Sequence, residues 1–204
     1  MVIQQTARTD STVINDRRKT MRVIAGSARS LTLKTIDSLD TRPTTDRIKE
    51  TLFNMIQFSV PGTEFLDLFA GSGGIGIEAL SRGARRAVFA DNNKKAVSVI
   101  EENIRHAKFE DRSYVIAGDY MSVINQLRSR DYHFGIVFLD PPYNKGLERK
   151  AMMLMREQSF VDENTIFIVE ADLHDDLSDI ESYGYEITRE KNYKTNKHVF
   201  FKEK

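Results

Sequence analysis

The chain of 204 residues carries 30 Lys and Arg against 30 Asp and Glu, and it contains no cysteine and no tryptophan. Its length predicts one domain with a real hydrophobic core, and 40% hydrophobic with 29% charged residues is the composition of a soluble globular protein. The missing thiol excludes disulfides, cysteine-ligated zinc and a cysteine nucleophile, and it favours a reducing compartment. No apolar run approaches the roughly 20 residues of a membrane span, and the first residues lack the apolar segment of a secretory signal. We therefore expect a cytoplasmic protein.

The zero net charge hides a split along the chain. Residues 1–35 hold seven Lys and Arg against two Asp, and residues 182–204 hold six Lys and Arg against three Glu. Residues 157–181, in contrast, hold nine Asp and Glu and no Lys or Arg. Both ends of the chain are thus basic. Charge alone indicates no more than solvated surface for these segments.

The first 60 residues do not follow the pattern of the remaining chain. Residues 1–20 are polar and show no period, so we interpret them as a flexible N-terminal extension. Two short strand-like pieces then flank Gly26, which predicts a small hairpin or extended arm over residues 22–36. A helix opened by Pro43 and stopped by Pro61 follows. Its apolar residues at helical spacing are Ile48, Leu52, Met55 and Ile56.

From residue 61 onward, strand-like and helical segments alternate. Short apolar runs predict strands at 64–70, 87–90, 114–117, 135–139 and 165–169, and helical spacing predicts helices at 75–81, 97–107, 123–127 and 147–157. This alternation is typical of βαβ units, which build a parallel sheet with helices on both faces. The tail, residues 185–191 and 197–202, predicts an antiparallel hairpin. We therefore expect an α/β, Rossmann-like fold with a mostly parallel sheet of seven strands.

Four consecutive predicted strands are followed by a carboxylate, at the edge of the sheet where open α/β folds bind ligands. The first strand leads through Asp67 into a glycine loop, Gly71-Ser72-Gly73-Gly74-Ile75-Gly76, which permits close approach of the backbone to a ligand and opens a helix. The ends of the other three strands carry Asp91-Asn92, Asp119-Tyr120 and Asp140. A series of four is a stronger signal than any one of these sites.

The glycine loop alone leaves the cofactor open. Gly71, Gly73 and Gly76 match G-x-G-x-x-G, and Asp91 follows Gly71 by 20 residues, which is the spacing of an NAD-binding fingerprint. Other nucleoside cofactors also carry a ribose with two hydroxyls, so Asp91 cannot discriminate between them. A tight turn with close helix packing would also explain Gly73 and Gly76, although the surrounding acids favour a binding loop.

The motif Asp140-Pro141-Pro142-Tyr143 decides against the dinucleotide. Its two prolines fix φ and remove two backbone donors, so the elbow presents hydrogen-bond acceptors and no N–H. An exocyclic amino group needs such a site, because it has protons to donate and an acceptor pair orients its nitrogen towards an electrophile. Tyr143 adds an aromatic face on which a base can stack. A strand-terminating turn with a packed tyrosine is the purely structural alternative.

The segments FLDLFAGSGGIGIEAL, ADNN, GDY and FLDPPY together resemble the class I S-adenosylmethionine-dependent methyltransferases that act on amino groups. The upstream segments MRVIAGSARSLTL and TRPTTDRIKETLFNMI narrow the resemblance to bacterial 16S rRNA guanine-N2 methyltransferases of the RsmD type, over residues 21–204. The resemblance implies methyl transfer to the N2 amino group of guanine 966 in small-subunit rRNA. It also implies one methyltransferase domain at 21–204, with an arm and helix at 21–60 and the Rossmann-like core at 61–204.

Roles for individual residues follow from this resemblance. It implies that Asp67 and the loop from Gly71 to Gly76 hold the methionine part of S-adenosylmethionine, Asp91 and Asn92 the ribose, and Asp119 and Tyr120 the adenine. Asp140 and the Pro141 carbonyl would accept hydrogen bonds from the guanine amino group. RNA phosphates would meet the basic arm and the basic tail hairpin, while the acidic segment at 157–181 faces away. The candidate phosphate-binding residues are Arg22, Arg29, Arg42 and Arg47.

Several alternatives stay open. The motif at Asp140 equally permits adenine N6 in DNA or glutamine N5 in protein as the methyl acceptor. An NAD-dependent oxidoreductase is disfavoured by the motif at Asp140, and a non-catalytic RNA-binding module because the carboxylate series is intact. The histidines show no metal-ligand spacing, so we expect no metal, and we expect a monomer.

Overall fold

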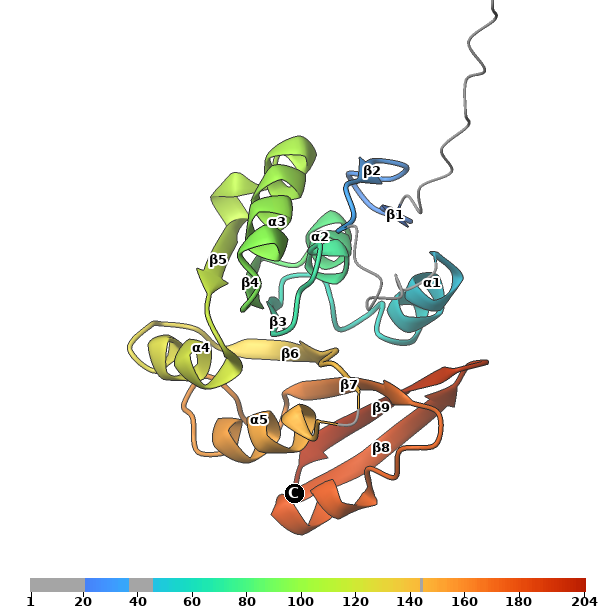
Figure 1. The fold of residues 1–204 in the computed structure, drawn as a ribbon, viewed down its shortest axis with the longest axis vertical. Helices are drawn as coiled ribbons and strands as arrows, with labels where there is room; N and C mark the ends of the chain where they lie inside the picture. The colour runs from blue at the N-terminus through green and yellow to red at the C-terminus, as the bar shows by residue number, and fades with distance from the viewer. Residues whose placement is uncertain (1–20, 37–45, 144) are drawn as a thin grey trace, which may run out of the picture.

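The computed structural model describes residues 21–36, 46–143 and 145–204, and seven of the strands in these ranges form one sheet. In chain order these strands are β3 (Glu64–Asp67), β4 (Arg86–Asp91), β5 (Ser113–Ala117), β6 (Phe134–Leu139), β7 (Ile166–Asp172), β8 (Tyr185–Asn192) and β9 (Asn196–Glu203). Their order in space is β5-β4-β3-β6-β7-β9-β8 (Figure 1). The first five are parallel, and β9 runs antiparallel to β7 and β8. The predicted fold class is confirmed, including the tail hairpin.

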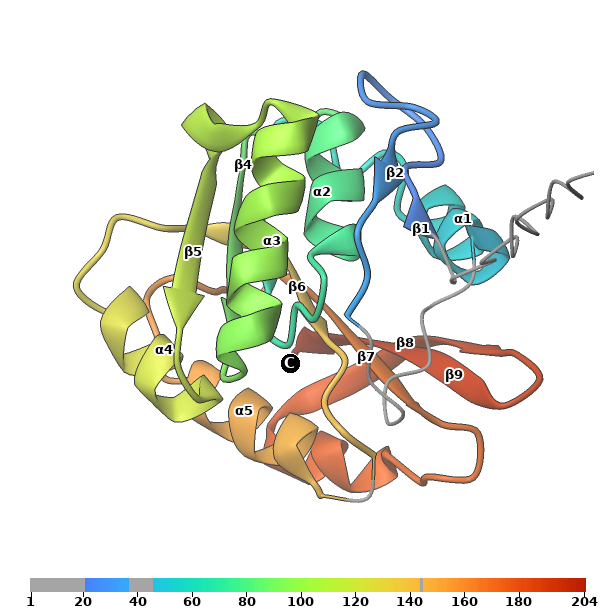
Figure 2. The same ribbon diagram turned by 45° about the horizontal axis from the view of Figure 1, so that its top comes forward.

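Helices cover both faces of this sheet (Figures 1 and 2). On one face lie α1 (Asp46–Met55), α2 (Gly74–Ser81) and α3 (Lys94–Ala107), and on the other lie α4 (Tyr120–Leu127) and α5 (Leu147–Met155). Neighbouring residues of one strand serve opposite faces: Phe65 belongs to the first hydrophobic cluster and Leu66 to the second. Short 3₁₀ helices at Glu110–Arg112 and Ser178–Tyr183 complete the chain path.

The helix α1 differs from its prediction at the C-terminal end. It ends at Met55, and the chain then reverses through turns in which the Ser59 N–H donates to the Ile56 carbonyl at 2.9 Å. Pro61 therefore does not stop the helix, because the chain has already turned back to enter β3. The turn leaves the Phe58 side chain 92% exposed. Its predicted start at Pro43 lies outside the described residues.

The predicted N-terminal hairpin is present and is attached to α2. Its strands β1 (Met21–Arg22) and β2 (Thr32–Leu33) pair antiparallel. The Ile24 and Ala25 N–H groups donate to the Glu78 carboxylate at 2.7 and 3.0 Å. Gly26 has a φ of +85°, and a Cβ there would lie 1.8 Å from the Ser81 carbonyl oxygen, so the hairpin can approach the helix only with glycine at this position.

A buried ion pair joins α1 to the same point of α2. The Lys49 side chain is fully buried, lies 3.4 Å from Glu78 and donates to the Arg22 carbonyl at 2.5 Å. Burial lowers the pKa of Lys49, and Glu78 opposes that shift. Glu78 thus holds the hairpin, α1 and α2 together behind the glycine loop.

Two further predictions concern membrane spans and the N-terminal extension. Within the ranges that the structure describes, no helix is both long and apolar enough to cross a membrane. The extension predicted at residues 1–20 lies outside the described residues.

Candidate active site

The carboxylates predicted at the strand ends lie along one edge of the sheet. Asp67 and Asp91 are the last residues of β3 and β4, Asp119 follows β5 by two residues, and Asp140 follows β6 directly. Because these strands are parallel neighbours, their carboxyl ends meet at this edge. The charge of Asp91 raises the pKa of Asp67, and the charge of Asp67 raises that of Asp140, as expected for neighbouring carboxylates. The structure therefore brings the predicted site together.

Backbone amides orient the carboxylate of Asp91. The Gly71 N–H donates to Oδ2 at 2.9 Å, and the Asn93 N–H donates to Oδ1 at 2.8 Å. Gly71 adopts a φ of +55°, in the left-handed region that favours glycine, which lets the loop turn back towards β4. Asn92 is exposed beside this pair. Each carboxylate oxygen keeps a lone pair for a ligand hydroxyl.

Asp67 is buried behind the glycine loop, with a side chain that is 1% exposed. Its Oδ2 accepts the Gly76 N–H at 3.0 Å. Burial raises the pKa of Asp67 to about 7, the Gly76 N–H opposes the shift, and the charge of Asp91 adds to it. A Cβ on Gly76 would lie 2.3 Å from Phe89, so close helix packing accounts for this glycine. The Gly76 N–H thus supports Asp67 behind the loop.

The remaining loop residues divide by exposure. Gly71 and Ser72 are partly exposed at the carboxyl edge, whereas Gly73 is buried against Ile100 with a φ of +79°. Asn103 of α3 fixes the loop from behind, since its Nδ2 donates to the Ser72 carbonyl at 2.9 Å. The same amide donates to Lys34, the residue after β2, also at 2.9 Å. The N-terminal hairpin and the glycine loop therefore share one anchor.

Asp119 caps α4. Its Oδ1 accepts the Met121 and Ser122 N–H groups, each at 3.0 Å. Oδ2 accepts no hydrogen bond from the described residues, and the side chain is exposed. The Tyr120 ring lies 6.2 Å from the ring of Phe69, which places an aromatic pair beside the cap. The capping geometry leaves one acceptor atom for a ligand amino group.

The motif from Asp140 to Tyr143 presents an acid and an aromatic ring at the end of β6. Burial raises the pKa of Asp140 well above its ordinary value, and the charges of Glu170 and Asp67 raise it further. Pro141 is buried and Pro142 is exposed, while the Tyr143 side chain is 41% exposed. The Tyr143 hydroxyl donates to Glu170 at 3.4 Å. An exposed ring with an anchored hydroxyl is suited to stacking.

Glu170 corrects the expectation that the acidic segment faces away as a whole. It lies in β7, is 6% exposed, and points to the same edge as Asp140. Other acids of the segment do gather elsewhere: Asp175 and Asp179 pair with Arg149 of α5 at 3.2 and 2.8 Å. Glu170 follows the apolar residues 166–169 of β7. An acid at the end of a buried apolar run is the sequence signal that could have identified it.

Two residues of β9 complete the surroundings of Glu170, and the sequence motifs do not include them. The Asn196 amide donates to Oε1 at 2.7 Å, and His198 Nε2 lies 3.1 Å from Oε2. Their contact depends on the pairing of β7 with β9, in which Glu170 faces His198 directly. Residues 28 apart in a chain show no such register before the sheet is known.

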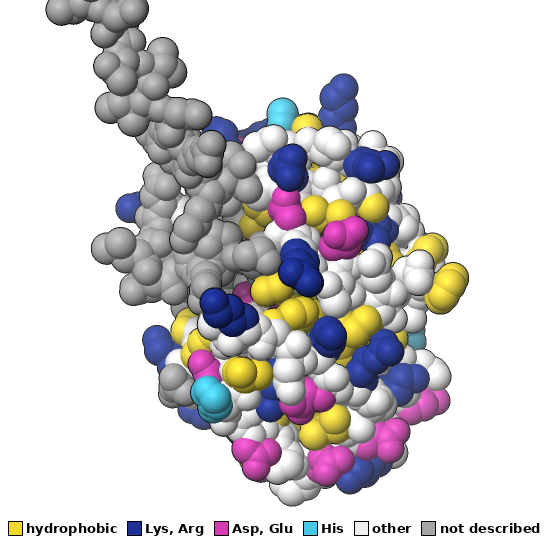
Figure 3. Space-filling model, turned by 90° about the vertical axis from the view of Figure 1, so that its right-hand side faces the viewer, with side chains coloured by type: hydrophobic (Ala, Val, Ile, Leu, Met, Phe, Trp, Pro, Cys, Tyr) yellow, Lys and Arg dark blue, Asp and Glu magenta, His cyan; other side chains and the backbone are white. Residues whose placement is uncertain are grey.

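The candidate phosphate-binding arginines differ in their surroundings. Arg22 is tied to Asp46 at 3.2 Å, whereas Arg29 and Arg47 are exposed and form no ion pair with any described residue. Arg42 lies outside the described residues. On the side of the molecule shown in Figure 3, Lys and Arg side chains spread over the middle of the face, and Asp and Glu gather towards its lower end.

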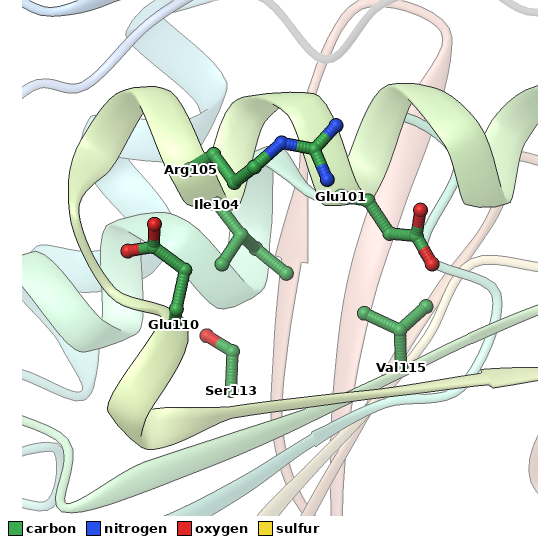
Figure 4. Close-up of a pocket in the computed structure, with 6 residues that line it drawn as sticks. All are labelled: Glu101, Ile104, Arg105, Glu110, Ser113 and Val115. Atoms are coloured by element: carbon green, nitrogen blue, oxygen red, sulfur yellow. The ribbon is translucent and has the colours of Figure 1, made fainter.

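Two surface hollows lie away from this edge. One, of about 300 Å³, opens between α3 and the start of β5, where Glu101, Arg105 and Glu110 surround Ile104 (Figure 4). The other, of about 320 Å³, lies at the start of β3 and β6 beside Thr63 and Gly135. Both are next to the amino ends of strands, so they form no part of the candidate site. Within the described ranges, no three His, Asp or Glu side chains are grouped as metal ligands.

The sheet order and the carboxylate edge define a class I methyltransferase fold. An O-methyltransferase from Bacillus cereus, solved in complex with SAH, shares this fold at 13% identity, with a TM-score of 0.64 over 82% of this chain and 84% of that chain. The structure of yhhF from Escherichia coli is more similar, with 28% identity and a TM-score of 0.78 over 91% of this chain and 98% of that chain.

Sequence comparison narrows the class to a family. The family model described as "Conserved hypothetical protein 95" matches residues 21–202. The ribosomal RNA small subunit methyltransferase D of Haemophilus influenzae is 36% identical over 74% of this chain and 79% of its own length. The protein of the same name from Escherichia coli K12 is 32% identical over 84% of each chain. The chain belongs to this family of ribosomal RNA small subunit methyltransferase D proteins.

Proposed function

We propose that the protein transfers a methyl group from S-adenosylmethionine to the N2 amino group of a guanine in 16S rRNA, at guanine 966 as the family resemblance implies. The names of its relatives support rRNA as the substrate. The acceptor would be the small ribosomal subunit or an assembly intermediate of it, in the cytoplasm. Residues 21–204 would act as one methyltransferase domain, and as a monomer without a metal.

The charge of the carboxyl edge is the observation that carries this proposal. No Lys or Arg of the described residues forms an ion pair with Asp67, Asp91 or Asp119, the acids of the cofactor strands. Uncompensated carboxylates stabilise a cationic ligand, and S-adenosylmethionine carries a sulfonium and an ammonium group. The pyrophosphate of NAD would instead meet like charges. The edge therefore fits the methyl donor better than the dinucleotide.

The cofactor would be held along β3, β4 and β5. Asp67 and the partly exposed Gly71-Ser72 backbone lie where the methionine part would bind, and Asp91 with Asn92 would accept the ribose hydroxyls. Oδ2 of Asp119 would accept the adenine amino group, with Tyr120 against the ring. When bound, the cofactor supplies a methyl group on a sulfonium, which already has a good leaving group.

The acceptor base would be held at the end of β6. Asp140 and the Pro141 carbonyl would accept the two amino protons of guanine and so aim its nitrogen lone pair at the methyl carbon. Such alignment can contribute roughly 7–11 kcal/mol to catalysis. The amino nitrogen would have to lose a proton once it carries the methyl group, and its raised pKa makes Asp140 a stronger base for that proton than an ordinary carboxylate. Tyr143 would stack on the base once it has left its own stack, which costs a few kcal/mol.

The experiment that tests this proposal offers several acceptors in parallel. Labelled S-adenosylmethionine is incubated with the protein and 30S subunits, naked 16S rRNA, DNA or a protein extract. We expect label in 30S subunits or 16S rRNA. Label in DNA alone would instead favour adenine N6, and label in protein alone glutamine N5. Binding of NAD without binding of S-adenosylmethionine would restore the oxidoreductase, and cofactor binding without any transfer would favour a non-catalytic RNA-binding module.

A further inference from the structure

A network of side chains lies beside Tyr143, and the roles proposed above do not account for it. Its centre is Glu170, which accepts hydrogen bonds from the Tyr143 hydroxyl (3.4 Å), the Asn196 amide (2.7 Å) and, at 3.1 Å, faces His198 Nε2. These groups come from the loop after β6, from β7 and from β9. The acceptor motif is thus joined by side chains to the C-terminal hairpin.

His198 is a rigid support for Glu170. Its side chain is fully buried, and the rings of Phe138 and Tyr193 meet it edge-on at 6.0 and 5.1 Å. Its Nδ1 lies 3.1 Å from the Tyr193 hydroxyl, so both ring nitrogens are engaged and the imidazole cannot turn. With Asn196 also buried, the carboxylate of Glu170 has one orientation.

Among the partners of Glu170 in the described part of the chain, only Tyr143 reaches the surface. Its ring is 41% exposed, whereas Asn196 and His198 are buried. Two prolines precede it and restrict the backbone, but they leave the side-chain torsions free. A hydrogen bond at the far end of the ring fixes the position of the hydroxyl oxygen and so the long axis of the ring. Because a phenolic O–H prefers to lie in the plane of its ring, the direction of the acceptor also favours one ring plane.

The position of Glu170 is costly for the folded state. Its charge adds to burial in raising the pKa of Asp140, so it disfavours the ionised form of Asp140. A neutral glutamine would avoid that repulsion, but it has one acceptor oxygen in place of two and no charge to strengthen the hydrogen bond from the Tyr143 hydroxyl. Stability alone therefore does not account for an acid here, and a function of the charge in orienting its partners does.

We propose that Glu170, held by Asn196 and His198, is a positioning residue that fixes the Tyr143 hydroxyl and so sets the ring plane on which the acceptor base stacks. This inference rests on the proposed function, because it concerns the same acceptor site. Glu170 acts through Tyr143 and does not touch the reacting atoms. The methyl donor is held on the other side of β6, so its affinity is independent of Glu170.

A double-mutant cycle between Glu170→Gln and Tyr143→Phe tests the proposal, with methyl transfer to the RNA acceptor and cofactor affinity as readouts. We expect Glu170→Gln to lower kcat about tenfold in the wild-type background, since a misplaced group can cost up to a hundredfold. In the Tyr143→Phe background, which has no hydroxyl to fix, the same change should cost less than about twofold. Cofactor Kd should change less than about twofold in each variant. Glu186→Gln, an exposed carboxylate on β8, is the matched control.

An equal loss in both backgrounds would overturn the proposal, because a structural defect at Glu170 does not depend on the Tyr143 hydroxyl. A second readout does not require turnover. In protein labelled with ¹³C in the rings of its seven tyrosines, with Tyr143 assigned from Tyr143→Phe, Glu170→Gln should shift and broaden the Tyr143 signals and Glu186→Gln should not. Unchanged Tyr143 signals in Glu170→Gln would contradict the proposal even if no acceptor were methylated, whereas the failure of transfer by wild-type protein would contradict the proposed function alone.

Discussion

The two halves of the carboxyl edge hold their acids by different means. In the half formed by β3, β4 and β5, which we call the cofactor half, Asp67, Asp91 and Asp119 accept hydrogen bonds from backbone amides two to 20 residues away in the chain. In the half formed by β6, β7 and β9, which we call the acceptor half, Glu170 is surrounded by side chains 26 to 28 residues away. One half is held by backbone amides of the loops at the strand ends, and the other by side chains that the register of the sheet brings together.

The two halves should therefore respond differently to substitution. In the cofactor half each acid is tied to backbone amides of nearby loops, so a substitution there removes a ligand contact and disturbs the loop that makes it. A substitution in the acceptor half removes a member of a network whose partners lie on three elements. We therefore expect the two halves to fail separately, with binding of the cofactor lost from one and transfer lost from the other.

The largest effect is expected for Asp140→Ala in the acceptor half. Loss of the acceptor that aligns the amino group should lower methyl transfer by more than about a hundredfold, because alignment provides much of the rate. Affinity for S-adenosylmethionine, measured by calorimetry, should stay within about twofold. Asp131→Ala, at the opposite end of β6, is the matched control. Near-normal transfer by the Asp140→Ala protein would remove Asp140 from the mechanism.

The converse effect is expected for Asp91→Asn in the cofactor half. The amide keeps the shape of the side chain, and it loses a charged acceptor whose hydrogen bonds contribute roughly 1.5–3 kcal/mol each. Affinity for S-adenosylmethionine should fall about ten- to a hundredfold. At saturating cofactor the transfer rate should recover. Unchanged affinity together with lost transfer would show that the halves are not separate.

The same two halves differ in how well the sequence predicts their residues. The glycine loop and the four strand-end carboxylates were predicted, because local turns need particular residues at fixed spacing. Glu170, Asn196 and His198 were not, because their contact arises only when β9 pairs with β7. Lys49 is a similar case in the fold. Helical spacing predicts the apolar stripe of α1, but the burial of this cation depends on Glu78 of α2, which is distant in the chain.

A smaller effect is expected from the pH dependence of cofactor binding, since the pKa of Asp67 is raised to about 7 by burial. The cationic cofactor favours the ionised carboxylate, so affinity should rise as the pH increases through 7, by about tenfold between pH 6 and pH 8. Asp67→Asn, which cannot ionise, should show weak affinity without this dependence. If the affinity of the wild-type protein fell from pH 6 to pH 8, the ionised Asp67 would not be holding the cationic cofactor.

The smallest effect is expected for the exposed arginines Arg29 and Arg47. If each holds one RNA phosphate, each alanine substitution should lower the slope of log affinity against log salt by roughly one. The loss should be similar for all RNA sequences, with cofactor affinity unchanged. Arg105→Ala, at the end of α3 beside the amino ends of the strands, serves as the control. Equal slopes for all three variants and the wild type would exclude these arginines from the RNA surface.

Analysis of the methylated nucleoside tests the central claim most directly. 30S subunits from cells that lack the endogenous enzyme are incubated with S-adenosylmethionine and wild-type or Asp140→Ala protein, and the 16S rRNA is digested to nucleosides for mass spectrometry. We predict N2-methylguanosine with the wild-type protein and none above background with Asp140→Ala. Methyl groups on adenine N6, or on ribosomal protein and not on rRNA, would contradict the account.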